Sequence, residues 1–227
     1  MYSLLLLNGG IGSRIGANQP KQLLKVQGIP LLVYSLIAVD SVNAIDQIVL
    51  NYPRGWKKAI NDVLQAYPVK TPVILVEAGK TRHASVADML PYAKNDHVII
   101  HESARPLISK DDFEKLIIAP QENVSYMLDI PFTVAPVNPE THTVTGSLER
   151  DNLRNVQLPQ KFNKQHLLEA HQKSEQRGEQ FTEDATLVAS NGFPVFFING
   201  NDYNIKVTTP LDITIATHLL QREHDNE

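Results

Sequence analysis

The chain has 227 residues, of which 42% are hydrophobic, and its formal net charge at pH 7 is −4. This length and apolar content are sufficient for one ordinary domain with a complete core. The absence of cysteine excludes disulfides, thiolate nucleophiles and cysteine-based zinc sites, and the mild acidity argues against a nucleic-acid polymer as partner.

The first predicted element is a buried strand at Tyr2–Leu7, because this short apolar run is followed by glycines. The segment has no basic n-region, and it is too short for a signal peptide or a membrane span. We therefore expect a cytoplasmic protein without a membrane partner.

The loop after this strand combines glycines with positive charge. Its glycines are Gly9, Gly10, Gly12 and Gly16, and its cations are Arg14 and Lys21. Glycine lets the backbone approach a bulky anion, successive N–H groups can cradle phosphate oxygens, and Arg and Lys add full charges. The first acid in the chain is Asp40, so this segment is a local positive island. The loop is interpreted as a polyphosphate site, with a flexible surface loop as the alternative.

Spacing excludes two familiar phosphate motifs. The dinucleotide fingerprint G-x-G-x-x-G fails because Ile15 stands where the third glycine belongs, counting from Gly10. The P-loop pattern fails at Gly79-Lys80-Thr81, because Ile74 occupies the position of its first glycine.

Helices and strands alternate over the first half of the chain. Helices are predicted at 30–42, 53–67, 81–92 and 110–118, and strands at 47–52, 73–76 and 97–101. This alternation predicts an α/β fold with a mainly parallel sheet. Ligands of such sheets bind beyond the carboxyl ends of the strands, which selects the loops at 8–21, 77–85 and 102–106.

The alternation stops in the middle of the chain. A strand is expected at 134–137, and the polar stretch 138–155 has hairpin character around Thr145-Gly146-Ser147. An isolated hairpin is marginally stable in water, so this one is either a mobile flap or buried against a second subunit. Beyond it we expect a helix at 163–177 capped by Asn163, and a short helix near Thr182. A strand at 194–198, a strand-like run at 204–208 and a last helix at 210–221 complete the chain.

Two clusters follow predicted strands. Gly79-Lys80-Thr81-Arg82, with Ser85 one turn later, places a cation and hydroxyls at a helix N-terminus, which suits an anion or a base edge. The alternative is a solvated helix start. In the second cluster, the carboxylate of Glu102 and the guanidinium of Arg105 are expected at the sheet edge, where they could contact a ligand. The alternative is a local ion pair without a function. Lys206 alone would usually be a surface residue.

Six blocks resemble the polyol-phosphate cytidylyltransferase family in order and spacing. They are GGIGSRIG with PKQLL, GKTRHASV, HESARP, RDNLRNVQLPQKF, TEDA and NIKVTTPLD. The resemblance runs nearly end to end and implies a Rossmann-like α/β domain over 1–227, with a protruding β-arm at 138–155. It also implies CTP and a small polyol phosphate as substrates, Mg²⁺ or another divalent cation, and a homodimer formed through the arm.

The resemblance assigns residues to each part of the site. It implies nucleotide contacts from Asn8, Gly9, Gly10, Gly12, Gly79, Thr81, Arg82 and Ser85, catalytic cations at Arg14, Lys21 and Lys206, and acceptor contacts from Glu102, Arg105, Arg150, Thr182 and Asp184. Glu102 is also the expected metal ligand, and Arg150 would reach the acceptor of a neighbouring subunit. The reaction would be in-line attack of the acceptor phosphate on the α-phosphorus of CTP, expelling diphosphate. Because a phosphate monoester is already an anion near pH 7, no general base is required.

Departures from the family pattern bear on the acceptor. Asn8-Gly9 stands where the erythritol enzymes usually have two alanines, and HESARP, QLPQ and TEDA replace HDAARP, QTPQ and TDDA. The double glycine and residues 53–56 look more like the ribitol branch, so ribitol 5-phosphate is favoured, with 2-C-methyl-D-erythritol 4-phosphate as the alternative. The acceptor decides between a cell-wall polymer of the teichoic acid type and isoprenoid biosynthesis. A non-catalytic nucleotide-binding module, and a nucleotidyltransferase for another base or a sugar 1-phosphate, stay open.

Overall fold

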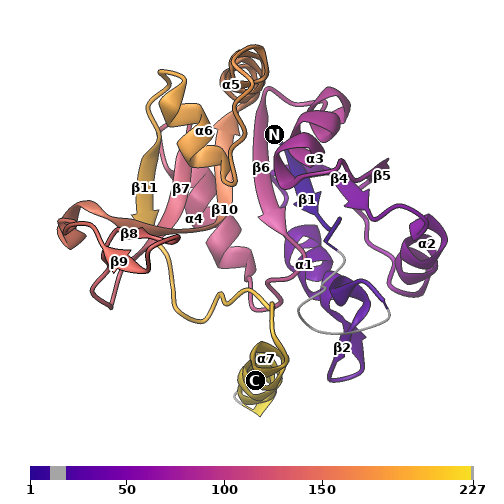
Figure 1. Cartoon of the computed structure of the whole chain (residues 1–227). Helices are drawn as coiled ribbons and strands as arrows, with labels where there is room; N and C mark the ends of the chain where they lie inside the picture. Colours follow the sequence, from indigo (N-terminus) through magenta and orange to yellow (C-terminus); the bar gives the residue numbers. More distant parts are fainter. Residues whose placement is uncertain (11–18, 226–227) are drawn as a thin grey trace.

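The computed structural model describes residues 1–10 and 19–225, with side chains up to Gln221. A seven-stranded sheet of order β11-β7-β10-β6-β1-β4-β5 forms its centre (Figure 1). β1 (Tyr2–Leu7) lies between β4 (Ile45–Tyr52) and β6 (His97–Glu102), and β5 (Val73–Glu77) lies beyond β4. These four strands are parallel, which confirms the predicted α/β fold with a mainly parallel sheet.

Helices cover both faces of the sheet, which explains the unbroken apolar sequence of β1. Leu4 and Leu6 pack on the face covered by α1 (Leu31–Asp40), α2 (Lys57–Ala66) and α4 (Lys110–Ile118). Leu5 and Leu7 pack on the other face, under α3 (Arg82–Met89), α5 (Lys164–Gln176) and α6 (Asp184–Ser190). Successive side chains of a strand point to opposite faces, so a strand buried on both sides needs apolar residues at every position.

The predicted helices form, with small shifts of their ends. α2 begins later than predicted because residues 53–56 form a turn in which Gly55 has φ +83°. A short 3₁₀ helix (Leu90–Tyr92) follows α3, and Asn163 caps α5 by accepting from the N–H groups of Gln165 and His166. The predicted Asn163 cap is therefore confirmed.

The strand predicted at 134–137 is wrong, and the strand β10 (Arg154–Asn163) was not predicted. β10 runs antiparallel to both β6 and β7 (Val124–Asp129) in the middle of the sheet. Its polar side chains conceal it in the sequence, because they are buried with their own partners. Gln160 donates to Ser125 Oγ at 3.0 Å, and Lys161 donates to the carbonyl of Ala119 at 2.5 Å.

A small hairpin of β8 (Val137–Asn138) and β9 (Thr143–Val144) projects from the side of the sheet where β7 and β11 lie (Figure 1). Its turn lies at 139–142, not at 145–147 as predicted, and His142 there has φ +55°. Val137 and Val144 on this hairpin are 58% and 69% exposed, and Phe132 just before it is 76% exposed, so three large apolar side chains are open to solvent on the single chain.

The C-terminal part brings a remote segment to the end of β6. β11 (Phe196–Asn199) pairs parallel with β7, which confirms the strand predicted near 194–198. The run at 204–208 is irregular and not a strand, but the N–H of Val207 donates to the carbonyl of Ala104 at 2.8 Å. α7 (Pro210–Asp225) follows and packs near the ribbon of β2 (Lys25–Val26) and β3 (Ile29–Pro30). None of the helices in the described ranges is long and apolar enough to span a membrane.

Candidate active site

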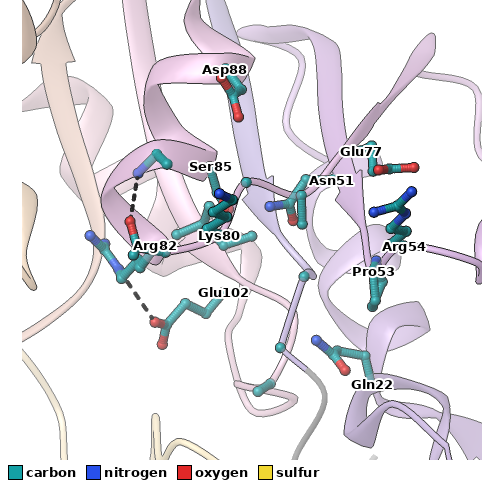
Figure 2. A pocket seen from close by; sticks show the side chains of 18 of the residues that line it. Gln22, Asn51, Pro53, Arg54, Glu77, Lys80, Arg82, Ser85, Asp88 and Glu102 are labelled. Carbon is teal, nitrogen blue, oxygen red and sulfur yellow. Dashed lines mark hydrogen bonds and ion pairs between the residues drawn. The ribbon is translucent and has the colours of Figure 1, made fainter.

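A pocket of about 1150 Å³ opens at the carboxyl ends of β1, β4, β5 and β6 (Figure 2). Of the predicted site residues, those that line it are Gly9, Gly10, Lys21, Gly79, Thr81, Arg82, Ser85, Glu102 and Lys206. Arg14 and Gly12 lie outside the described residues. The pocket is at the position expected for a ligand of a mainly parallel α/β sheet.

Two of the glycines are required by close packing. A Cβ on Gly9 would lie 2.5 Å from the Cβ of Ala78, and one on Gly79 would lie 2.9 Å from Ala84. Contacts under 3.0 Å are not tolerated between such atoms, so the loop after β1 approaches the loop after β5 only with glycine at position 9, and the loop after β5 packs against α3 only with glycine at position 79. Thr81 then caps α3 by accepting from the N–H of Ala84 at 3.1 Å.

Asn8 is buried at the start of the first loop, which it holds in place through hydrogen bonds, and it does not line the pocket. Its carbonyl accepts from Gln22 Nε2 at 2.8 Å, and its Oδ1 accepts from Ser103 Oγ at 2.6 Å. Its own N–H donates to Asn51 Oδ1. These bonds attach the start of the loop to the strand ends on either side of β1.

Two cations from opposite ends of the chain meet at the pocket. Lys21 donates to the carbonyl of Val207 at 2.9 Å, and the adjacent Lys206 donates to Glu102 Oε1 at 2.8 Å. The long-range bond from Lys21 therefore joins the first loop to the segment before α7. The result is a pair of ammonium groups suited to a polyphosphate.

Glu102 is a buried carboxylate surrounded by cations. Besides Lys206, Arg105 Nε lies 3.4 Å from its Oε2 and Arg82 Nε lies 3.8 Å from its Oε1. Burial by itself would raise the pKa of Glu102, but the charges of Lys206, Arg105 and Arg82 outweigh it and lower the pKa to about 2. Glu102 is therefore ionised at neutral pH.

This environment does not suit the metal role expected for Glu102. Its carboxylate is already engaged by three positive side chains, and no group of three His, Asp or Glu in the described ranges could hold a metal ion. Mg²⁺ is commonly bound by one or two carboxylates together with substrate phosphates. The described residues therefore do not form a complete set of metal ligands without the substrate phosphates.

Arg82 bridges two acids. Its Nη2 lies 2.6 Å from Asp184 Oδ2, while its Nε faces Glu102 (Figure 2). Asp184 is 1% exposed and does not line the pocket, so in this structure it orients Arg82 and presents no atom to an acceptor. Thr182 is exposed just before α6, outside the pocket lining, although Gln180 nearby belongs to it.

The two remaining arginines lie apart from the pocket lining. Arg105 is buried and donates through Nη1 to the carbonyl of Asn204 at 2.7 Å, so it supports the segment that carries Lys206. Arg150 is exposed at the base of the arm, in a hollow of about 500 Å³ shared with Asp129, Asp151 and Arg154. No described contact joins Arg150 to the pocket of its own chain.

Several lining residues were not assigned a role from the sequence, although the loops 77–85 and 102–106, which hold some of them, were expected to bind the ligand. They are Leu7, Gln22, Asn51, Pro53, Arg54, Glu77, Ala78, Lys80, Ala84, Asp88, Ala104 and Gln180. Lys80 was part of a predicted cluster without a role of its own. For Asn51 there was a signal, since it is a polar amide that follows the apolar run Ile48-Val49-Leu50 at a strand end.

Two buried histidines make the fold sensitive to acid. Burial, with help from Arg105, lowers the pKa of His101 to about 3, and burial beside His83 lowers the pKa of His171 to about 3. The unfolded chain binds these protons below about pH 6.5 whereas the native state does not. We therefore expect the free energy of unfolding to fall between pH 6.5 and 3, by up to about 1.4 kcal/mol per pH unit for each histidine.

Urea denaturation of the wild type and of His171→Gln at pH 7, 6 and 5 measures this effect. The variant should have the flatter pH dependence, and His218→Gln, an exposed control, should follow the wild type. Parallel pH dependence of the wild type and His171→Gln would show that His171 is protonated in the native state.

The chain was compared with known proteins. Residues 3–222 match the family model of 2-C-methyl-D-erythritol 4-phosphate cytidylyltransferase, IspD. Proteins with that name from Bacillus cytotoxicus and Synechococcus sp. are 33% and 34% identical, covering 97% and 96% of this chain and 98% and 97% of theirs. The solved 4-diphosphocytidyl-2C-methyl-D-erythritol synthase of Anaerococcus prevotii superposes with a TM-score of 0.84 at 25% identity, over 97% of this chain and 96% of its own. The solved 2-C-methyl-D-erythritol 4-phosphate cytidylyltransferase of Thermus thermophilus gives a TM-score of 0.76 at 28% identity, over 97% of this chain and 100% of its own.

These matches confirm the predicted resemblance to the polyol-phosphate cytidylyltransferases. They also confirm the prediction that the protein is a nucleotidyltransferase. The preference for the ribitol branch is not supported, since the matched model and these relatives carry the name of the erythritol enzyme. The chain belongs to the 2-C-methyl-D-erythritol 4-phosphate cytidylyltransferase family.

Proposed function

We propose that this protein transfers CMP from CTP to 2-C-methyl-D-erythritol 4-phosphate and releases diphosphate. The observation that carries the proposal is the pocket at the strand ends, where Lys21 and Lys206 meet beside the glycine loop. The choice of acceptor follows the names of the relatives, which match almost the whole chain.

The charges of the pocket fit the chemistry of this reaction. An acceptor phosphate oxygen attacks the α-phosphorus of CTP, the bond to the β-phosphate breaks, and diphosphate leaves with the electron pair. Two anions have to meet, and negative charge grows on the α-phosphate and the leaving group, so fixed cations stabilise the transition state more than the ground state. Lys21 and Lys206 would supply that charge in our proposal.

Glu102 would act by positioning Lys206. The carboxylate holds Nζ at 2.8 Å and is itself held by Arg105 and Arg82, so the ammonium group has a defined place before substrate binds. Such preorganisation avoids rearrangement during the reaction. A divalent cation such as Mg²⁺ would neutralise phosphate charge, held mainly by the nucleotide.

An acceptor panel tests the proposed function. Diphosphate release from CTP and Mg²⁺ is measured with 2-C-methyl-D-erythritol 4-phosphate, with ribitol 5-phosphate and with other pentitol phosphates. We expect kcat/KM to be highest for the erythritol acceptor. A higher value for ribitol 5-phosphate would overturn the acceptor assignment, and CTP binding without diphosphate release from any acceptor would indicate a non-catalytic nucleotide-binding module.

We also propose a homodimer in which the arm of one subunit completes the acceptor site of the other. The exposed Phe132, Val137 and Val144 support this, because apolar surface of that kind is unfavourable in water. The exposed Arg150 would then reach the partner's pocket and contact the acceptor phosphate.

An Arg150→Ala variant should raise KM for the acceptor by about 10- to 100-fold with little change in KM for CTP, because a hydrogen bond to a charged group contributes about 1.5–3 kcal/mol. Steady-state kinetics with each substrate varied in turn measures this, and Lys58→Ala on the exposed face of α2 is the control. An unchanged acceptor KM, or a monomer with full activity at high dilution, would contradict the role of the arm.

A further inference from the structure

Asn51 is a buried amide in the wall of the pocket. It is the last residue but one of β4, it is 1% exposed, and it still belongs to the pocket lining. Its place at a strand end beside the glycine loop is where a ligand-reading residue is expected in this type of fold.

The orientation of this amide is fixed. Its Oδ1 accepts the N–H of Asn8, and an N–H needs an oxygen there, so the Nδ2 group has to point the other way. Nδ2 lies next to Gly9, 3.1 Å from where a Cβ on that residue would stand, and it has no hydrogen-bond partner among the described residues. A donor of defined direction is therefore left at the pocket wall.

The surroundings of Asn51 suit a base better than phosphates. Figure 2 shows Asn51 between Arg82 and Glu102 on one side and Arg54 and Glu77 on the other. Ala78 and Asn51 both face Gly9, and Gly79 and the buried Ser85 line the same pocket. The charged lining residues Arg54, Glu77, Lys80 and Asp88 are exposed and form only the rim. The triphosphate is attracted to the ammonium groups of Lys21 and Lys206, which leaves the neutral, buried wall for the base.

Cytosine and uracil differ at the atom that such a donor would test. N3 of cytosine accepts a hydrogen bond, whereas N3 of uracil carries a hydrogen and donates. A fixed N–H donor rejects the second arrangement, because two buried donors then face each other without an acceptor. We propose that Asn51 reads the Watson–Crick edge of the base, with Nδ2 donating to N3 of cytosine. This inference rests on the proposed function, since it takes CTP as the nucleotide.

Asn51→Asp is a sharp test, because the side chain keeps an oxygen for the Asn8 N–H and loses the donor, while the added charge affects both nucleotides alike. The matched nucleotide is 3-deaza-CTP, in which N3 is replaced by C–H. Dissociation constants of both nucleotides are measured by calorimetry for the wild type, for Asn51→Asp and for Asn61→Asp on α2, a control that adds the same charge outside the pocket lining. Thermal unfolding checks that the variants are folded.

The wild type and Asn61→Asp should bind CTP at least tenfold more tightly than 3-deaza-CTP, and this ratio should fall to near one in Asn51→Asp. Equal affinities in the wild type, or an unchanged ratio in Asn51→Asp, would overturn the role of Asn51. Equal affinities in the wild type would overturn the role of Asn51 even if Asn51→Asp does not fold. Because binding is measured without turnover, the acceptor panel can fail while the base-reading role stands, and the reverse also holds.

Discussion

A Lys21→Met variant should lose about 10²–10³-fold in kcat, which corresponds to about 3–4 kcal/mol of transition-state stabilisation. Lys21 places its ammonium group in the pocket and also donates to the carbonyl of Val207, so it acts where the first loop meets the segment carrying Lys206. Charge that grows on the phosphates during transfer is stabilised by such a group more than the ground state is. Methionine keeps the length of the side chain and removes the charge.

Steady-state kinetics with CTP and the acceptor measures this loss, and Lys25→Met is the control, because Lys25 is an exposed cation on β2 outside the pocket. A fall in kcat without a matching rise in KM would show that Lys21 acts in the transition state. Near-normal turnover by Lys21→Met would contradict its catalytic role.

A Glu102→Gln variant should lose about 3–5 kcal/mol of folding stability as well as most of its activity. The change leaves the buried Arg105 and the half-buried Arg82 without the carboxylate that now compensates them, and breaking a buried ion pair from one side has a cost of that size. Arg82 still pairs with Asp184, so Arg105 is the arginine that the loss of the Glu102 charge destabilises most. Lys206 would also lose the partner that positions it.

Urea denaturation and kinetics together measure this prediction, with Glu102→Asp as the matched variant that keeps the charge. Because the pKa of Glu102 is lowered to about 2 from 4.5, its contribution is complete above about pH 4.5 and is lost as the pH falls toward 2. The stability difference between wild type and Glu102→Gln should therefore shrink in acid. A Glu102→Gln protein as stable and active as Glu102→Asp at pH 7 would show that the charge is not needed.

Much of the fold was predictable because local patterns agree with the tertiary structure. The leucines of β1 indicated a buried strand, and Asn163 marked the start of α5. β10 was not predictable in this way, because Gln160 and Lys161 are buried and donate to partners that only the folded sheet provides. Polar side chains of that kind give a strand the composition of a loop.

The position of the site was predictable, but the pairing of its charges was not. Strand ends selected the loops that carry Lys21, Ser85 and Glu102, and these residues do line one pocket. The partnership of Arg82 with Asp184 joins α3 to α6, and no spacing rule connects residues so far apart in the sequence. The orientation of the Asn51 amide was likewise not predictable, because it is fixed by a hydrogen bond from the N–H of Asn8, a residue of another strand end.

A crystal structure of the protein with CTP and Mg²⁺ tests the central claim most directly, namely that the pocket at the carboxyl ends of β1, β4, β5 and β6 is the nucleotide site. The predicted result has phosphate oxygens within hydrogen-bonding distance of Lys21 Nζ and the base against Asn51 and Ser85. A nucleotide bound elsewhere, with Lys21 and Lys206 facing solvent, would contradict it.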